Sequence, residues 1–389
     1  MTTTIERDAH PTQGELVARA VELQPLLRKA HADSEVQRKQ PDEVIAALTA
    51  AGFFRLNKPR RFGGYPIDLR TTLRITEVLA EADASAGWVV GLASTAAWAA
   101  THGSEAVQQE IFADPDARFA GSGMPCPAQR VDGGLRLTGR WGYASGSPHA
   151  TWAALAAAVT DGPDQPPEPY FCIVPVAELR LEDTWHTVGM RGTGSNTYVA
   201  NDVFVPQHRL ISLAALTEGS ASGELPFGQV AILPLAGTML GVGRAALTLA
   251  TEQAPLKSMH HTVFARRSDS VGVQIQMAQA ALKLKTAQLH AFGVADDLDE
   301  VVAKRFDLSY EDRARARAQF GYAAQQVLEA IQILLNVHGA ASFAESSLMQ
   351  QYWRDANTAA RHAGLNEFVG YEIYGKALLD VDERISMMV

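Results

Sequence analysis

The chain has 389 residues, of which 47% are hydrophobic and 20% charged, a composition typical of a folded protein with two or three domains. Its formal net charge is −9 and it has no run of Lys or Arg, so we expect no nucleic-acid-binding surface. The two cysteines, Cys126 and Cys172, predict no disulfide framework and fit a reducing compartment. The polar segment 1–10 lacks the apolar core of a signal peptide, and no stretch has the roughly 18 apolar residues of a membrane span. We therefore expect a cytoplasmic protein that is not bound to a membrane.

The first part of the chain, from about residue 12 to residue 103, has helical signals. Pro41 is followed by two acidic residues, which suits the first turn of a helix, and Gly52 suits its end. A longer apolar pattern follows and includes Trp88 and Trp98. Packing between helices is the ordinary role of tryptophans at such spacing.

The composition changes after about residue 113. Proline and glycine now separate short apolar runs, a pattern typical of β-strands. The runs cover residues 135–137, 153–159, 170–174 and 198–205. A β domain is therefore predicted between two helical parts.

From about residue 227 the pattern is helical again. Ser309 followed by Asp312 predicts the start of a helix, one apolar face extends to Leu335, and Gly339 predicts its end. Four helices fit into this part of the chain, which predicts a four-helix bundle. The predicted domains are residues 1–113 (helical), 114–218 (β) and 219–389 (bundle).

Two patterns in this last part imitate known sites. Residues 241–246 imitate a dinucleotide fingerprint, but the preceding residues are helical rather than a strand, so we interpret the glycines as close helix packing. His260 and His261 are adjacent, point in different directions on a helix and have no Cys or His-Glu partner motif, so we predict no metal site.

The segment near the C-terminus resembles the last catalytic segment of the acyl-CoA dehydrogenase fold. Arg354 and Asp355 are followed, about two helical turns later, by the run from His362 to Phe368. In dehydrogenases this run holds the glutamate that abstracts the α-proton of the substrate. Here Ala363 occupies the matching position, so the resemblance implies that the dehydrogenase base is absent. This points to the flavin-dependent two-component monooxygenase branch of the superfamily.

Residues 139–152 carry a second resemblance. Their Trp141, Ser145, Gly146, His149 and Trp152 match the Trp-x-x-x-Ser-Gly-x-x-His-x-x-Trp pattern of monooxygenases that hydroxylate phenols and related rings. In that family the segment passes beside the middle ring of the flavin, and the serine bonds the N5 edge. A C4a-hydroperoxyflavin decays to peroxide unless N5–H finds an acceptor and water is excluded. The resemblance implies that Trp141, Ser145 and Gly146 bind the cofactor and that Ser145 is also catalytic. The alternative is an ordinary turn serine.

Three further groups of site residues follow from the same resemblance. Residues 183–196 look like a glycine-rich flavin-binding segment, with Ser195 as its cofactor residue and a structural turn as the alternative. Arg267 lies where dehydrogenases carry an arginine that holds the flavin phosphate. His338 and Gly339 lie in the loop that reaches the flavin of a neighbouring subunit. Because these last motifs are degraded, FMN and FAD both remain possible.

His362 is the predicted catalytic residue for oxygen transfer. An imidazole with a pKa near neutrality can take the proton of a phenol or indole, or protonate the peroxyflavin. The alternative is a histidine that satisfies carbonyl groups at a helix end. Trp88, Trp98 and His149 are predicted to line the substrate pocket.

The resemblance covers essentially the whole chain. It implies an α+β, acyl-CoA dehydrogenase-like fold with an N-terminal helical domain, a middle β-barrel or sandwich, and a C-terminal four-helix bundle. The implied function is the oxygenase component of a two-component monooxygenase that hydroxylates an aromatic substrate with reduced flavin (FADH2 or FMNH2) and O2. A separate NAD(P)H-dependent flavin reductase would supply the flavin, and the expected assembly is a homotetramer, a dimer of dimers. Alternatives are N-oxidation of an amine, an acyl-CoA dehydrogenase with a displaced base, and a non-catalytic scaffold.

Overall fold

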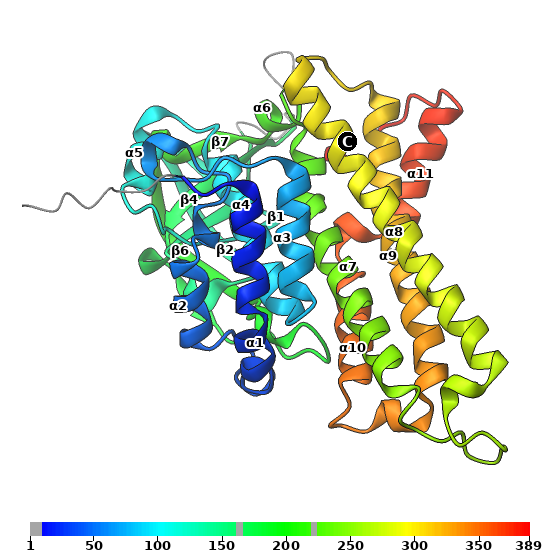
Figure 1. Ribbon diagram of the computed structural model, residues 1–389. Helices are drawn as coiled ribbons and strands as arrows, with labels where there is room; N and C mark the ends of the chain where they lie inside the picture. Colours follow the sequence, from blue (N-terminus) through cyan, green and yellow to red (C-terminus); the bar gives the residue numbers. More distant parts are fainter. Residues whose placement is uncertain (1–9, 161–165, 219–223) are drawn as a thin grey trace, which may run out of the picture.

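The computed structural model describes residues 10–160, 166–218 and 224–389 (Figure 1). The N-terminal segment 1–9 and part of the proline-rich run near residue 163 lie outside the described residues. Figure 1 shows the strands on one side, the long C-terminal helices on the other, and α3 and α4 between them. The predicted acyl-CoA dehydrogenase-like order of helices, sheet and helices is confirmed.

Five helices and two 3-10 turns precede the sheet. They are α1 (Gln13–Gln37), α2 (Asp42–Ala50), η1 (Phe53–Arg55), η2 (Arg60–Phe62), α3 (Leu69–Ala80), α4 (Ala84–Ala100) and α5 (Glu105–Phe112). A capping box between Thr12 and Glu15 starts α1. After α2, Gly52 adopts φ 85°, a left-handed conformation that glycine tolerates best. Almost every residue of α3 and α4 is buried, so these helices form the interior side of the domain.

The middle part forms one mixed sheet of the seven described strands, where the sequence predicted a barrel or sandwich. The strands are β1 (Phe119–Val131), β2 (Gly134–Ala144), β3 (Trp152–Val159), β4 (Glu168–Pro175), β5 (Arg180–Glu182), β6 (Asn196–Pro206) and β7 (Leu210–Ser212). Their order is β5-β6-β2-β1-β3-β4-β7. Only β1 and β3 pair in parallel, and the other neighbours are antiparallel. The connections contain η3 (Ser147–His149), η4 (Val176–Glu178), η5 (Arg191–Thr193) and η6 (Gln207–Arg209), and α6 (Leu213–Glu218) follows β7.

The C-terminal part is helical, as predicted, with three long helices and two short ones. They are α7 (Phe227–Gln253), α8 (Val271–Lys304), α9 (Tyr310–His338), α10 (Leu348–Ala359) and α11 (Glu367–Leu378), separated by η7 (Arg267–Asp269), η8 (Ala340–Phe343) and η9 (Ala363–Leu365). Ser309 caps α9 by accepting a hydrogen bond from Asp312 N, and Gly339 follows its last residue. The fourth segment predicted for the bundle is divided into α10, which contacts α7 and α9, and α11, which contacts α9.

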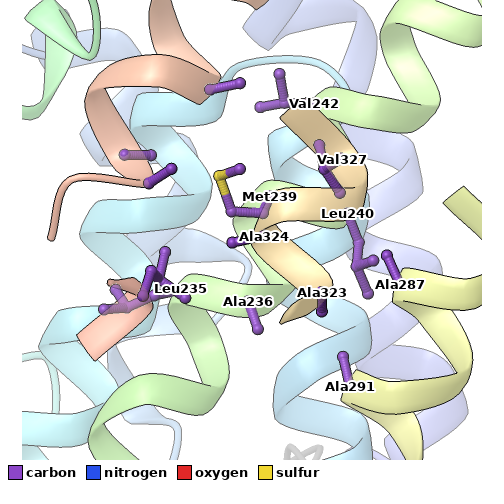
Figure 2. Close-up of a cluster of buried hydrophobic side chains, with 14 of the residues drawn as sticks. Leu235, Ala236, Met239, Leu240, Val242, Ala287, Ala291, Ala323, Ala324 and Val327 are labelled. Atoms are coloured by element: carbon purple, nitrogen blue, oxygen red, sulfur yellow. The ribbon is translucent and has the colours of Figure 1, made fainter. Parts of the chain in front are cut away.

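The largest core lies around α7. Figure 2 shows Leu235, Ala236, Met239 and Leu240 of α7 packed near alanines of α8 and α9. By length and composition α7 is the one described helix that could cross a membrane, but 83% of its most apolar window is buried inside the protein. It is therefore the core helix of the bundle.

The glycines of α7 explain how closely α3 approaches it. A Cβ atom at Gly237 would lie 2.1 Å from Thr76 Oγ1, and one at Gly241 would lie 2.3 Å from Glu77 O. Gly243 similarly faces Leu284 of α8 at 2.5 Å. The interpretation of this motif as close helix packing is confirmed.

Candidate active site

Three segments that are distant in the sequence converge at Trp88. This tryptophan belongs to α4 and is buried, and its Nε1 donates a hydrogen bond to Ser145 Oγ over 3.2 Å. Its ring also meets the ring of His362 edge to face, with centroids 5.6 Å apart and planes at 78°. Trp88 therefore links the turn after β2 to the segment after α10, and brings together the two predicted catalytic residues, Ser145 and His362.

The turn that presents Ser145 has an unusual backbone. Tyr143 adopts φ 59° and Gly146 φ 80°, so the chain reverses sharply between β2 and η3. Gly146 N donates to Thr193 O over 2.7 Å, which ties the turn to the segment before β6. A left-handed φ is costly for residues with a side chain, so glycine at 146 permits this turn, where a Cβ would lie 3.2 Å from Val89 Cγ1.

A row of buried hydroxyl groups extends from Ser145. Its Oγ lies 2.7 Å from Ser195 Oγ, and Ser195 Oγ lies 2.7 Å from Thr193 Oγ1. Thr193 Oγ1 donates to Met190 O over 2.8 Å. All three hydroxyl residues are at most 6% exposed. Ser195 thus lies beside Ser145, and Thr193, which was not among the predicted site residues, lies next to Ser195 in the row. Thr193 could have been recognised in the sequence, because it precedes Gly194 directly as Ser195 follows it.

The segment that carries this row is held by α10. Asp355 is buried and accepts a hydrogen bond from Met190 N over 2.6 Å and another from Gln351 Nε2 over 3.2 Å. Burial raises the pKa of the Asp355 carboxyl to about 6. Arg354 donates to Val188 O and pairs with Glu35 of α1 at 3.3 Å. The Arg-Asp pair therefore positions the loop that carries the hydroxyl row.

His362 follows α10, and its environment fixes its tautomer. Nδ1 accepts a hydrogen bond from Gly364 N over 3.1 Å, so the neutral ring carries its proton on Nε2. The residue is open to solvent on one side, yet protein atoms crowd the rest of the ring. This poor solvation, with a smaller contribution from the positive charge of Arg317, lowers the pKa of His362 to about 4. The predicted pKa near neutrality is therefore wrong, and at neutral pH the ring is a neutral Nε2–H donor.

Arg317 of α9 is a charged residue of this region that the sequence analysis missed. It is 3% exposed and donates from Nη2 to the carbonyl groups of Ala363 and Asn366. Burial lowers the pKa of its guanidinium to about 10, so it stays charged at neutral pH. Its position between Ala314 and Phe320, on an otherwise apolar face of α9, could have marked it in the sequence as a buried charge.

Two of the residues predicted for the substrate pocket lie elsewhere. Trp98 stacks on Phe227 of α7, with ring centroids 6.1 Å apart and planes at 14°. It is ten residues from Trp88, which corresponds to about 15 Å along α4. His149 faces the start of α2, where its Nδ1 lies 3.9 Å from Asp42 Oδ1, and burial lowers the pKa of its ring. Helix packing thus describes Trp98, while Trp88 alone of the three contacts the Ser145–His362 region.

Trp141, predicted to bind the cofactor, lies inside the β domain. It has no exposed surface, and its Nε1 donates to Ala156 O over 2.7 Å across the sheet. A side chain without free surface offers no contact to a ligand. Trp141 therefore positions β2, the strand that ends at the Ser145 turn.

The residues predicted for the phosphate end of the flavin form a separate cluster at the end of α9. Arg267 donates to Val337 O over 3.0 Å and to His338 O, and His338 Nε2 pairs with Gln253 Oε1 at 2.8 Å. Gly339 adopts φ 77°, and a Cβ there would lie 3.2 Å from Arg267 Nη2. The cluster borders a small crevice lined by Ala250, Gln253, Ala254, Arg267, Val337 and His338. Arg267 here satisfies the last carbonyl groups of α9.

Comparison with known proteins agrees with this arrangement. The family model described as "Acyl-CoA dehydrogenase, N-terminal domain" matches residues 16–114, and the "Acyl-CoA dehydrogenase, C-terminal domain" model matches residues 233–367. The oxygenase component of an FADH2-dependent resorcinol hydroxylase from Rhizobium sp. (strain MTP-10005) is 31% identical over 388 residues, covering 95% of each chain. The chain belongs to the acyl-CoA dehydrogenase superfamily.

Further relatives place this superfamily member in the flavin-dependent monooxygenase branch. The oxygenase subunit HsaA of a flavin-dependent monooxygenase from Rhodococcus jostii (strain RHA1) is 31% identical. The alignment covers 91% of this chain and 95% of the HsaA chain. The structure of XiaF from Streptomyces sp., in complex with FADH2 and glycerol, superposes with a TM-score of 0.91 at 35% identity. That superposition covers 96% of this chain and 97% of XiaF.

Proposed function

We propose that this chain is the oxygenase component of a two-component flavin-dependent monooxygenase that hydroxylates a phenol- or indole-like ring. The observation that carries the proposal is the convergence of Trp88, Ser145 and His362 beside Ala363, the position of the dehydrogenase base. Alanine cannot abstract an α-proton, whereas the neighbouring groups provide hydrogen bonds. The resorcinol hydroxylase relative, whose alignment covers 95% of this chain, supports a phenolic substrate.

The cofactor of this proposal is reduced flavin, FADH2 or FMNH2, with O2 as the second substrate. Bound reduced flavin supplies the two electrons that oxygen insertion into the ring requires. Ser145 and Gly146 would lie against the flavin edge, and Ser195 would hold the Ser145 hydroxyl. The XiaF complex with FADH2 supports this choice of redox state. We also propose that Arg267, His338 and Gly339 contact the phosphate end of the flavin.

His362 acts in this proposal as a hydrogen-bond donor. Its Nδ1 is occupied by Gly364 N–H, so Nε2–H is the group that is free to meet a substrate. A donor directed at the oxygen of a phenol stabilises the phenolate that forms when the phenol loses its proton to solvent, and the phenolate ring is the more nucleophilic form. The guanidinium of Arg317 donates to the carbonyl of Ala363, next to His362, and its positive charge also stabilises a negative charge on a substrate bound at His362.

The proposed assembly is a homotetramer, a dimer of dimers, in the cytoplasm, served by a separate NAD(P)H-dependent flavin reductase. Its support is an apolar stripe on α8, where Ile275, Leu282 and Leu289 are 54%, 67% and 62% exposed. These residues recur at heptad spacing, which suits packing against a helix of a second copy. Sedimentation of wild type and of the Leu282→Glu variant tests this assembly. A monomeric wild type at micromolar concentration would contradict it.

The function is tested by turnover with flavin that a reductase keeps reduced. Phenols, indoles and amines are supplied in turn, and hydroxylated product and hydrogen peroxide are measured per NADH consumed. We expect product from a phenol or indole, with most of the flavin oxidation coupled to it. Reduction of tightly bound oxidised flavin by an acyl-CoA thioester, under anaerobic conditions, would instead identify a dehydrogenase.

A further inference from the structure

The hydroxyl row behind Ser145 has a defined polarity. Met190 O is a carbonyl oxygen and can only accept, so Thr193 gives its single hydroxyl proton to it. The 2.7 Å contact between Thr193 and Ser195 must then take its proton from Ser195. By the same reasoning, the 2.7 Å contact between Ser195 and Ser145 takes its proton from Ser145. The Ser145 proton therefore points along the row, away from the site.

The other end of the row is compatible with the same direction. The indole nitrogen of Trp88 can only donate, and it donates to Ser145 Oγ over 3.2 Å. Ser145 thus gives one hydrogen bond, to Ser195, and receives one, from Trp88. A hydroxyl oxygen accepts two hydrogen bonds, so one accepting position is left for a further partner.

The anchor of the row is itself held in place. Met190 adopts φ 54°, and its N–H donates to the buried carboxyl of Asp355. Its carbonyl also accepts from Trp185 Nε1 over 2.9 Å and from Thr193 N over 3.2 Å. Because Thr193, Ser195 and Ser145 are buried, water does not compete for their protons. Reversing the row would cost the hydrogen bond from the Thr193 hydroxyl to Met190 O, so the row favours the direction in which Ser145 donates to Ser195.

We propose that Thr193 and Ser195 are positioning residues that hold Ser145 as a hydrogen-bond acceptor, so that the site selects reduced flavin over oxidised flavin. The inference rests on the proposed function, in which Ser145 meets the flavin N5. In reduced flavin N5 carries a hydrogen and donates, which matches the free accepting position of Ser145. In oxidised flavin N5 carries a lone pair, so two acceptors would face each other. An oxygenase that shares free flavin with a reductase needs this preference, because it must capture reduced flavin and release the oxidised form.

The test is the ratio of the dissociation constants for oxidised and reduced FMN and FAD, measured by anaerobic and aerobic titration. An unpaired buried polar group costs enough to give wild type a preference on the order of 10- to 100-fold for reduced flavin. In Thr193→Val the Ser195 proton can turn to Ser145, and the Ser145 proton becomes free for oxidised N5. We expect the ratio to fall by about tenfold, mainly through tighter binding of oxidised flavin. Ser195→Ala should act in the same way, and Thr193→Ser should restore the wild-type ratio.

The matched control is Thr197→Val. Thr197 is a buried threonine nearby on β6 whose hydroxyl pairs with Thr184 Oγ1 at 2.7 Å, outside the row. A purely structural loss would weaken both redox forms equally and leave the ratio unchanged, as we expect for this control. An unchanged ratio in folded Thr193→Val and Ser195→Ala, with a changed ratio in Ser145→Ala, would overturn the inference alone. An unchanged ratio in Ser145→Ala, or a wild type that binds neither form, would overturn the proposed flavin contact as well.

Discussion

Replacing His362 by Asn and by Gln separates hydrogen-bond donation from proton acceptance. In the structure Nδ1 accepts from Gly364 N over 3.1 Å, and Nε2–H is free. The Oδ1 atom of asparagine stands near the place of Nδ1 and keeps the contact with Gly364, but its amide does not reach the place of Nε2. Glutamine places an amide N–H near Nε2. Neither amide takes up a proton, so a general base would be lost in both variants.

The expected magnitudes differ between the two roles. Loss of a hydrogen bond to a charged oxygen costs about 1.5–3 kcal/mol, which is roughly 10- to 150-fold in rate. Loss of a general base costs about 100- to 10,000-fold. We expect the rate of oxygen transfer to fall by the factor for a lost hydrogen bond, roughly 10- to 150-fold, in His362→Asn. His362→Gln should retain most of the wild-type rate.

The assay measures hydroxylated product and hydrogen peroxide per reduced flavin oxidised, in a single turnover. Binding of reduced flavin is measured beside it and should be nearly unchanged in both variants. Two variants that are equally inactive, with normal flavin binding, would refute donation and favour proton acceptance. Normal coupling in both would remove His362 from the reaction.

Three further predictions concern stability. Burial raises the pKa of Asp355 from 3.8 to about 6, so the folded chain binds more protons than the unfolded chain between these values, and the unfolding free energy should fall by about 3 kcal/mol as pH rises through this window. Denaturant unfolding of Asp355→Asn should lack this fall; an identical pH profile would refute it. Burial lowers the pKa of Lys58 from 10.5 to about 7, so its contribution to the unfolding free energy should rise with pH from about 7 to 10.5, and Lys58→Met should remove that rise. Gly241→Ala should destabilise by about 1–3 kcal/mol in thermal unfolding, because its Cβ would press on Glu77 O, whereas Gly293→Ala, which meets open space, should be neutral or stabilising.

The elements of the fold could be predicted from the sequence because their signals are local. Ser309 and Gly339 bound α9 as capping chemistry predicts, and the glycines of α7 were recognised as packing positions. The pairing of the strands was not predictable in this way. The parallel contact of β1 with β3 joins strands separated by β2, and no local pattern records it.

The residue types of the candidate site could be read from the sequence, but the direction of its hydrogen bonds could not. Trp88 links Ser145 to His362, and the direction of their protons depends on Met190 O and on Gly364 N–H. These are backbone groups, and every residue carries them, so no residue type reveals their role. The low pKa of His362 likewise arises from burial, with a smaller contribution from the charge of Arg317 on α9.

Transfer of one oxygen atom from O2 to an aromatic ring can be measured in a single turnover with chemically reduced flavin, a phenol such as resorcinol, and ¹⁸O2, followed by mass spectrometry of the products. We expect one ¹⁸O atom per molecule of hydroxylated ring, with little hydrogen peroxide. Hydrogen peroxide alone, from every phenol and indole offered, would contradict it.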